Sequence, residues 1–322
     1  RVRPVEDDYL DLAAALSGFG GLYFDDAGRL TVLLRDVRQL EGAKGRVRAF
    51  LSKFARSEGA KTHARRSAEA LRVRAAKHEF RELVAWQHAH LRDLSRIPGA
   101  TFVAIDHAEN RIVVGVGQQG MVEAAKTAAR ALPIPRTALE IQAVGDIKET
   151  ARTQDTSLYE VVNPRPAGVQ ISAGTSACTL GFNVKRWITS NTADTALYFV
   201  TASHCSADQA TLEQYTMGQP SSGVSIGYEV VDPGWITPSQ NSLCTYQENC
   251  FLTDASLFRF YNSTSAQQGL IAKTDGSGGL TIEGRYAVAD VEVPVQGAYV
   301  YSTGITSGRR GGYVRYPCGM VV

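Results

Sequence analysis

The first half of the chain alternates apolar and polar positions in patterns typical of both strands and helices. Residues 20–34 and 100–116 each contain two apolar runs on either side of a polar turn, which predicts two β-hairpins. Between them, residues 67–96 contain no Gly or Pro and repeat their apolar residues at helix-face spacing, so we expect a long helix there. An alanine-rich helix at 121–132 and a strand at 137–144 follow. The pattern predicts a mixed α+β domain.

From residue 166 onward the pattern is that of short strands alone. The segment 145–168 is polar and contains two prolines near its end, which is typical of a linker. Beyond it, apolar runs rich in β-branched and aromatic residues are separated by Gly, Asn, Asp, Ser or Pro. The expected strands are GVQISAG, CTLGFNVKR, ALYFVTAS, SIGYEVV, DASLFRFY, GLIAKT, YAVADVEV and AYVYSTG. They predict an all-β barrel or sandwich, so we divide the chain into an α+β domain, 1–160, and an all-β domain, 161–322.

Charge is distributed unevenly over the two halves. Residues 1–165 carry five more basic than acidic groups, and residues 166–322 carry three more acidic than basic groups. The basic excess lies mostly between Arg35 and Arg96, where a nucleic-acid-binding arm is one interpretation. The interleaved apolar residues at helical spacing favour a solvated helix face instead, so we expect no nucleic-acid partner. No apolar run approaches the ~18 residues that span a bilayer, and we expect no membrane partner either.

All five cysteines lie in the second half, at positions 178, 205, 244, 250 and 318. This usage indicates an oxidising compartment for that half. Their spacing fits neither a zinc ribbon nor a CxxC redox motif, and His204 is the only histidine in that half, so we expect no metal and no cofactor. Cys244 and Cys250 have a spacing suited to a short disulfide. The odd number leaves one cysteine without a partner within the chain.

The segment FVTASHCS, residues 199–206, concentrates the candidate chemistry. His204 follows an apolar strand and directly precedes Cys205. A lone histidine is most often structural, but TASHC together with CTLGFNV upstream resembles the histidine loop of the chymotrypsin-like serine proteases, in particular the secreted bacterial branch of α-lytic protease and the streptogrisins. The resemblance implies that His204 is a general base, that Cys178 and Cys205 form a disulfide, and that this half folds as a double β-barrel.

A second motif supports the first. NCFLTDASLFRF, residues 249–260, resembles the aspartate segment of the same family and identifies Asp254. The other interpretation is an aspartate that caps a turn at the start of a strand. Because Asp254 follows His204 by 50 residues, in the order that the family uses, we favour the catalytic role. In that role its carboxylate orients the imidazole and stabilises the imidazolium.

The serine in TDGSGGL, Ser277, raises the question of the nucleophile. The family places its nucleophile in a Gly-Asp-Ser-Gly-Gly loop, whereas residues 275–279 read Asp-Gly-Ser-Gly-Gly. Ser277 also lies only 23 residues after Asp254, and the segment that resembles the one preceding the nucleophile loop comes later, at 300–314. We therefore expect Ser277 to be a loop residue, the nucleophile to be absent from these 322 residues, and the second barrel to be incomplete. Cys318, whose family partner would also lie downstream, is expected to be unpaired.

The resemblance also gives the first half a role. Proteases of this branch carry a long N-terminal pro-region of hairpins and helices, which assists folding and inhibits the enzyme until it is cut. Residues 1–160 fit this description. We expect the second hairpin and the strand at 137–144 to dock on the protease and residues 145–165 to run toward the cleft near His204. Cleavage is expected in the linker between residues 151 and 166.

The sequence thus predicts the zymogen of a secreted serine endopeptidase that hydrolyses protein or peptide substrates through a Ser-His-Asp triad, with its own pro-region as a partner in cis. The alternative is a non-enzymatic, protease-like binding or scaffold protein. Two explanations of the missing serine stay open, a fragment of a longer protease or a pseudoprotease. Among the histidines of the first half, His107 is expected in a turn, and His88 and His90 on a helix surface.

Overall fold

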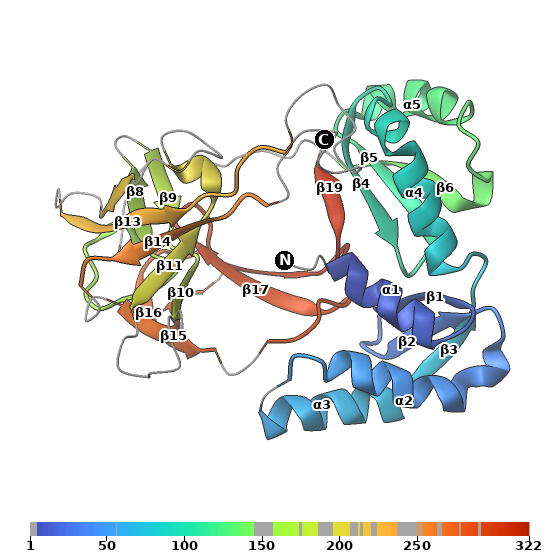
Figure 1. Cartoon of the computed structure of the whole chain (residues 1–322), viewed down its shortest axis with the longest axis horizontal. Coiled ribbons are helices and arrows are strands. Elements are labelled where there is room, and N and C mark those ends of the chain that lie inside the picture. The colour runs from blue at the N-terminus through green and yellow to red at the C-terminus, as the bar shows by residue number, and fades with distance from the viewer. Residues whose placement is uncertain are drawn as a thin grey trace. The chain divides into compact units, whose positions relative to one another are not determined.

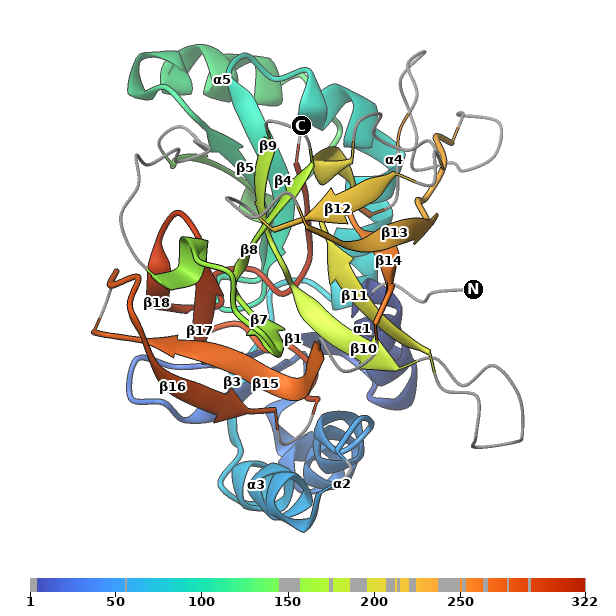
Figure 2. The same cartoon turned by 90° about the vertical axis from the view of Figure 1, so that its left-hand side faces the viewer.

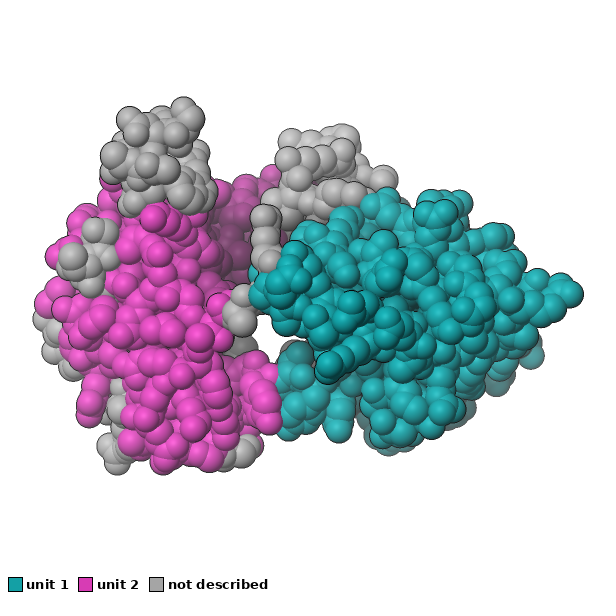
Figure 3. Space-filling model, turned by 90° about the horizontal axis from the view of Figure 1, so that it is seen from below, with its two compact units in different colours: residues 1–148, 290–300, 312–322 teal, residues 149–289, 301–311 magenta. Residues whose placement is uncertain are grey.

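The structure, a computed structural model, describes most of the chain (Figure 1). The described residues are 5–55, 57–144, 157–173, 176–185, 196–206, 212, 215–219, 224–236, 250, 253–262, 266–276, 278–288 and 291–321. The chain forms two compact units, which Figure 3 shows in different colours. Unit 1 comprises residues 1–148, 290–300 and 312–322, and unit 2 comprises residues 149–289 and 301–311.

Unit 1 holds the five α-helices of the described residues and two small sheets. The α-helices are α1 (Val5–Ala15), α2 (Leu40–Leu51), α3 (Glu58–Glu69), α4 (Phe80–Ser95) and α5 (Val122–Ala129), and the 3₁₀ helices are η1 (Val37–Gln39), η2 (Gln119–Met121) and η3 (Arg136–Ala138). The first sheet, in the order β1-β2-β3, is made of β1 (Phe19–Phe24), β2 (Leu30–Leu34) and β3 (Arg72–Ala75). The second, in the order β19-β4-β5-β6, is made of β4 (Ala100–Asp106), β5 (Arg111–Val116), β6 (Leu139–Ala143) and β19 (Gly319–Val321).

Both hairpins that the apolar pattern predicts are present, as β1–β2 and β4–β5. The first closes through Asp25, whose Oδ1 accepts from the backbone N–H groups of Ala27 and Arg29. Gly28 in the same turn has φ 70°, a left-handed conformation that glycine adopts without steric penalty. Local turn chemistry therefore fixes the register of this hairpin, in agreement with the sequence pattern.

The long helix expected at 67–96 is instead two helices with a strand between them. α3 ends at Glu69 and α4 begins at Phe80, where Glu79 and Glu82 form a capping box. Between them β3 pairs in parallel with β2. Arg72 and Arg74 of β3 are largely exposed, so this edge strand lacks the apolar alternation that would reveal it. The helix prediction was wrong here because tertiary pairing, rather than Gly or Pro, interrupts the helical pattern.

Two segments from the end of the sequence belong to unit 1, which the boundary near residue 160 did not anticipate. β19 pairs antiparallel with β4, Gly319 lying opposite Ala104 and Val321 opposite Phe102. The second hairpin therefore pairs with a strand from the downstream half of the sequence. β6, the other element expected to dock, lies at the opposite edge of this sheet and pairs with β5.

Gln296 holds the first returning segment against the turn of the second hairpin. Its side-chain Oε1 accepts from the backbone N–H of His107 at 2.6 Å and from that of Ala108 at 3.3 Å. Its Nε2 donates to Asp106 Oδ1 at 2.8 Å. All three atoms of the turn are thus satisfied by one side chain from 190 residues downstream.

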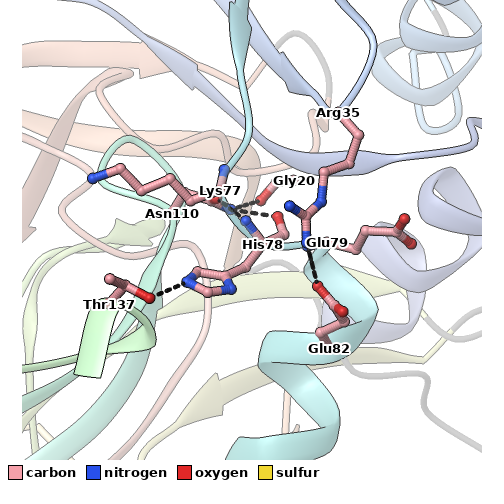
Figure 4. Close-up of polar contacts among 8 residues, drawn as sticks. All are labelled: Gly20, Arg35, Lys77, His78, Glu79, Glu82, Asn110 and Thr137. Atoms are coloured by element: carbon pink, nitrogen blue, oxygen red, sulfur yellow. Dashed lines mark hydrogen bonds and ion pairs between the residues drawn. The ribbon is translucent and has the colours of Figure 1, made fainter. Parts of the chain in front are cut away.

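Asn110 joins the same turn to the first sheet and to the start of α4 (Figure 4). Its Oδ1 accepts from the backbone N–H groups of Lys77 and His78, both at 2.7 Å. Its Nδ2 donates to the carbonyl oxygens of Gly20 and His78, both at 2.9 Å. The residue is 3% exposed and has φ 56°, a left-handed conformation that asparagine tolerates better than most side chains. One amide therefore satisfies four backbone contacts in the interior of unit 1.

His107 lies in the hairpin turn, as expected, and its side chain is buried. Its ring packs 4.5 Å from the Tyr9 ring and 5.1 Å from the Phe80 ring, between centroids. Its Nδ1 accepts from the backbone N–H of Leu22 at 3.3 Å. Burial lowers the pKa of His107 to about 4, although the neighbouring Asp106 acts in the opposite direction. The imidazole is therefore neutral at pH 7.

We expect the free energy of unfolding of unit 1 to fall as the pH is lowered from about 6.5 to about 4. In this window the unfolded chain binds a proton at His107 that the folded protein excludes, so stability rises with pH and is lost on acidification. The shift of the pKa corresponds to about 3 kcal/mol. Urea unfolding followed by circular dichroism at 222 nm, at pH 7 and at pH 4.5, measures the change.

The control is His107→Asn, whose amide oxygen can still accept from Leu22. Because other titrating groups are the same in both proteins, the difference in pH slope between wild type and variant isolates His107. His88 contributes with the opposite sign, since its hydrogen bond to Glu6 raises its pKa. Identical slopes in the two proteins would show that burial of His107 is not what makes unit 1 sensitive to acid.

Unit 2 consists mostly of β-strands (Figure 2). Its seven-stranded sheet, in the order β10-β11-β14-β13-β12-β8-β9, is made of β8 (Gln170–Ala173), β9 (Ser176–Thr179), β10 (Phe182–Lys185), β11 (Leu197–Thr201), β12 (Thr216–Gly218), β13 (Ser225–Val231) and β14 (Ser256–Phe260). A three-stranded sheet contains β7 (Arg165–Ala167), β15 (Ala266–Thr274) and β16 (Ile282–Ala287). The 3₁₀ helices are η4 (Ser157–Tyr159) and η5 (Ser203–Cys205), and a two-stranded ribbon, β17 (Tyr299–Gly304) and β18 (Gly308–Tyr313), spans residues of both units.

The seven-stranded sheet curls back on itself as a half-barrel. Its two outermost strands, β9 and β10, are consecutive in the chain and are separated only by Leu180 and Gly181. Leu180 N–H donates to the Val169 carbonyl on one side, and Gly181 N–H donates to the Val200 carbonyl on the other. One nearly continuous segment therefore contacts both ends of the sheet, the arrangement by which a sheet avoids open edges.

Aromatic packing fills the inside of this curled sheet. Phe199 is fully buried, and its ring lies 5.1 Å from Phe258 and 4.7 Å from Phe260, between centroids. Gly227 allows the strands to approach, since a Cβ there would lie 2.4 Å from the Arg259 carbonyl oxygen. Alternating apolar residues thus place the core where the pattern predicts it.

The described residues form a mixed α+β fold that is mostly β in its second half, and one expected strand differs from the prediction. Among the described residues of the expected strand YAVADVEV, 286–293, only Tyr286 and Ala287 belong to a strand. Val293 and Val295 are instead buried in unit 1, at 5% and 2% exposure. Their apolar character reflects packing in the first unit rather than a place in a β-sheet.

Candidate active site

Three neighbouring strands of unit 2, β11, β14 and β13, have termini that lie together at one end of the curled sheet. Thr201, the last residue of β11, lies opposite Ser256, the first residue of β14. Val231, the last residue of β13, pairs with Leu257 of β14. The chain that leaves β11 therefore enters the turn 203–205 directly above the start of β14 and the end of β13. This position brings the histidine turn next to the residues that precede β14.

His204 and Asp254 lie within hydrogen-bonding reach, as the sequence predicts. Asp254 Oδ2 is 2.5 Å from His204 Nδ1, and Oδ1 accepts from the backbone N–H of His204 at 3.0 Å. Both carboxylate oxygens thus bind one residue, which fixes the ring as well as its backbone. When Nδ1 carries the proton that it donates to Asp254, Nε2 keeps a lone pair and can act as a base.

The side of the His204 ring that faces away from Asp254 ends in Nε2. The His204 side chain is 48% exposed and that of Asp254 is 37% exposed. Among the described residues, His204 Nε2 makes no hydrogen bond. A second reactant can therefore approach Nε2 while Nδ1 is held by Asp254. This arrangement is capable of general acid–base chemistry.

A disulfide ties the histidine turn to β9. Cys205 is bonded to Cys178, with the two Cα atoms 6.1 Å apart, and this pairing is confirmed. The bond closes a loop with a sequence separation of 27 residues, which corresponds to about 3.5 kcal/mol in the chain-entropy treatment. Both cysteines belong to the buried core of unit 2. The turn is therefore anchored to the interior directly after the histidine.

Ser203 and Ser206, on either side of His204 and Cys205, contact a carboxylate that was not identified from the sequence. Ser203 Oγ donates to Asp232 Oδ1 at 2.6 Å, and Ser206 Oγ lies 3.4 Å from Asp232 Oδ2. Asp232 directly follows β13. It belongs to no recognised motif, and its only signal in the sequence is its place after a strand that must pair with the one beginning near Asp254.

The other residues singled out from the sequence have different outcomes. Cys250 is disulfide-bonded, while its predicted partner Cys244 lies outside the described residues. Ser277 also lies outside them. Cys318 is a free cysteine, as predicted, and it is exposed. Within the described part of the chain, no group of three His, Cys, Asp or Glu residues is arranged to hold a metal ion, and no helix is long and apolar enough to cross a membrane.

No protein-family model matches the chain, and no curated protein is significantly similar to it. The candidate site therefore depends on its own geometry and on the residues that form it.

Proposed function

We propose that the chain is the zymogen of a secreted serine endopeptidase of the chymotrypsin-like type. The observation that carries the proposal is the His204–Asp254 pair, in which one carboxylate holds both the ring nitrogen and the backbone of the histidine. The Cys178–Cys205 disulfide beside it is the one that the family resemblance implies. The curled sheet of unit 2 is compatible with the first of two β-barrels, and the disulfide favours an extracellular protein.

In the proposed reaction a serine hydroxyl attacks the scissile carbonyl carbon while His204 Nε2 takes its proton. The imidazolium then protonates the leaving amine, and an acyl-enzyme remains. Water attacks the ester in the second half, with Nε2 again accepting the proton and returning it to the serine. Asp254 stabilises the imidazolium in both halves. In this proposal, none of the serines of residues 1–322 is the nucleophile.

The N-terminal residues are proposed to act as the pro-region. This proposal is supported by the segments that make up unit 1, which combines residues 1–148 with two downstream segments. One of them, β19, pairs with β4, so the N-terminal residues supply a template for a downstream strand. Cleavage is proposed between residues 151 and 166, of which residues 151–156 lie outside the described part of the chain.

Labelling with a fluorophosphonate, which reacts with activated serines, tests the enzymatic proposal. Two proteins are compared, residues 1–322 and the product of the uninterrupted reading frame. We expect no serine of residues 1–322 to react. We expect the longer product to be labelled at one serine, to hydrolyse peptides, and to lose both properties in His204→Ala.

Other outcomes have distinct meanings. A label on Ser277 would place the nucleophile within the chain and overturn the argument against it. A longer product that neither reacts with the probe nor hydrolyses peptides, or a reading frame that ends at Val322, would overturn the enzymatic proposal. A non-enzymatic, protease-like binding protein would then be the better description.

A further inference from the structure

A second carboxylate faces the histidine turn from the side of β13. Ser203 Oγ donates to Asp232 Oδ1 at 2.6 Å, within the short range of hydroxyl–carboxylate hydrogen bonds. Ser203 is 1% exposed and Asp232 is half-buried, so this bond is partly shielded from solvent. Ser206 Oγ donates mainly to the Ser203 carbonyl, at 2.8 Å, and lies 3.4 Å from the other oxygen of Asp232. The contacts join Asp232 to the residues on both sides of the His204–Cys205 pair.

The path of the backbone explains how Asp232 reaches this position. β13 and β14 pair in antiparallel fashion, with Glu229 opposite Phe258 and Val231 opposite Leu257. One extra residue on β13 therefore lies in a β-bulge just before the strand ends. Bulges bend a strand and redirect the side chains that follow. The bulge is thus placed to turn the side chain of Asp232 toward the neighbouring turn.

The two carboxylates act on adjacent residues of one short helix. Asp254 binds the N–H and Nδ1 of His204, while Asp232 binds the side chain of Ser203, one residue earlier. A tilt of η5 that moves His204 away from Asp254 would also displace Ser203 from Asp232. The orientation of the ring therefore depends on both contacts, although only Asp254 touches the imidazole.

We propose that Asp232 is a positioning residue for His204, acting through the hydroxyl of Ser203. The proposal rests on the proposed function, in which His204 must hold its Nδ1 proton on Asp254 to serve as the base. Asp232 keeps the turn at the angle that this hydrogen bond requires. A residue that merely stabilised the fold would leave the bond unchanged in the molecules that remain folded.

The test is proton NMR of the chain carrying ¹⁵N-labelled histidine, which reports the Nδ1 proton of His204 and its exchange with water. Asp254→Asn identifies the signal by abolishing it. In Asp232→Ala we expect exchange to be about ten-fold faster, the factor that corresponds to losing one hydrogen bond to a charged group. Ser203→Ala removes the same contact from its other end without leaving a buried hydroxyl, and should give the same increase.

Two further variants keep the result decisive. Asp232→Asn retains an oxygen that accepts from Ser203, so we expect it to restore most of the protection. If Asp232→Ala does not fold, Ser203→Ala carries the test, because it removes the same hydrogen bond. Glu283→Ala removes an exposed carboxylate of β16 and should change nothing. A lower melting temperature with unchanged exchange in Asp232→Ala and Ser203→Ala would overturn the positioning role. Failure to hydrolyse peptides would overturn the proposed function instead, and would leave the NMR result intact.

Discussion

Replacing Asp254 by asparagine is expected to lower kcat for peptide hydrolysis by about 10⁴-fold in the product of the uninterrupted reading frame. The carboxylate accepts the Nδ1 proton of His204 at 2.5 Å. An amide that presents its NH₂ group to Nδ1 would donate instead, so the ring would keep its proton on Nε2, the atom that must accept a proton from the serine. Steady-state hydrolysis of a chromogenic peptide across pH 6–9 measures the loss.

The fold should survive this substitution, which makes the activity loss interpretable. The amide oxygen of asparagine can still accept from the backbone N–H of His204, which Asp254 Oδ1 binds at 3.0 Å. Ser277→Ala is the matched control and should retain activity within two-fold of wild type. Near-normal activity in Asp254→Asn would contradict the assigned role, and a loss in Ser277→Ala comparable with that in Asp254→Asn would identify Ser277 as part of the reaction.

The largest effect on stability is expected from Asn110→Ala, which should lower the free energy of unfolding of unit 1 by about 4 kcal/mol. The substitution removes four hydrogen bonds of 2.7–2.9 Å and leaves their backbone partners without the side chain that satisfies them. It also places alanine at φ 56°, where a Cβ is unfavourable. Urea unfolding followed at 222 nm reports unit 1, because the described α-helices lie there.

Asn110→Gly separates the two causes. Glycine adopts the left-handed conformation freely, so this variant should recover about 1 kcal/mol relative to alanine and lose only the hydrogen bonds. Asn110→Asp keeps the two acceptor contacts but sets a carboxylate against two carbonyl oxygens, and should be no more stable than the alanine variant. A loss of less than about 1 kcal/mol in Asn110→Ala would show that backbone groups or water replace the amide.

Much of the fold could be predicted from the sequence because its strands follow local rules. The hairpins at 20–34 and 100–116 combine alternating apolar residues with turns whose polar side chains bind nearby backbone. The strand β3 could not be predicted, since its pairing with β2 leaves no apolar alternation in Arg72–Ala75. Pairing between distant segments overrides local preference at this point.

The residues of the candidate site also differ in whether local sequence reveals them. His204 and Asp254 could be found because they stand in short motifs whose residues are adjacent in sequence. Asp232 could not, since its role arises from the register of β13 against β14 and from a hydroxyl on a third segment. Gln296 escaped notice for a similar reason, because its contacts with Asp106 and His107 join parts of the chain 190 residues apart.

The pairing of β19 with β4 also implies a delay between the synthesis of β4 and the completion of its sheet. Gly319 lies opposite Ala104, 215 residues earlier. The sheet β19-β4-β5-β6 therefore cannot acquire its fourth strand until residues 319–321 have been translated. At a synthesis rate of about 5–20 residues per second, the edge of β4 waits roughly 10 to 40 s for its partner. During that interval the nascent chain presents an open strand edge, at which a holdase chaperone or a second nascent chain could bind. Translation speed downstream of β6 therefore becomes a determinant of the yield of native protein.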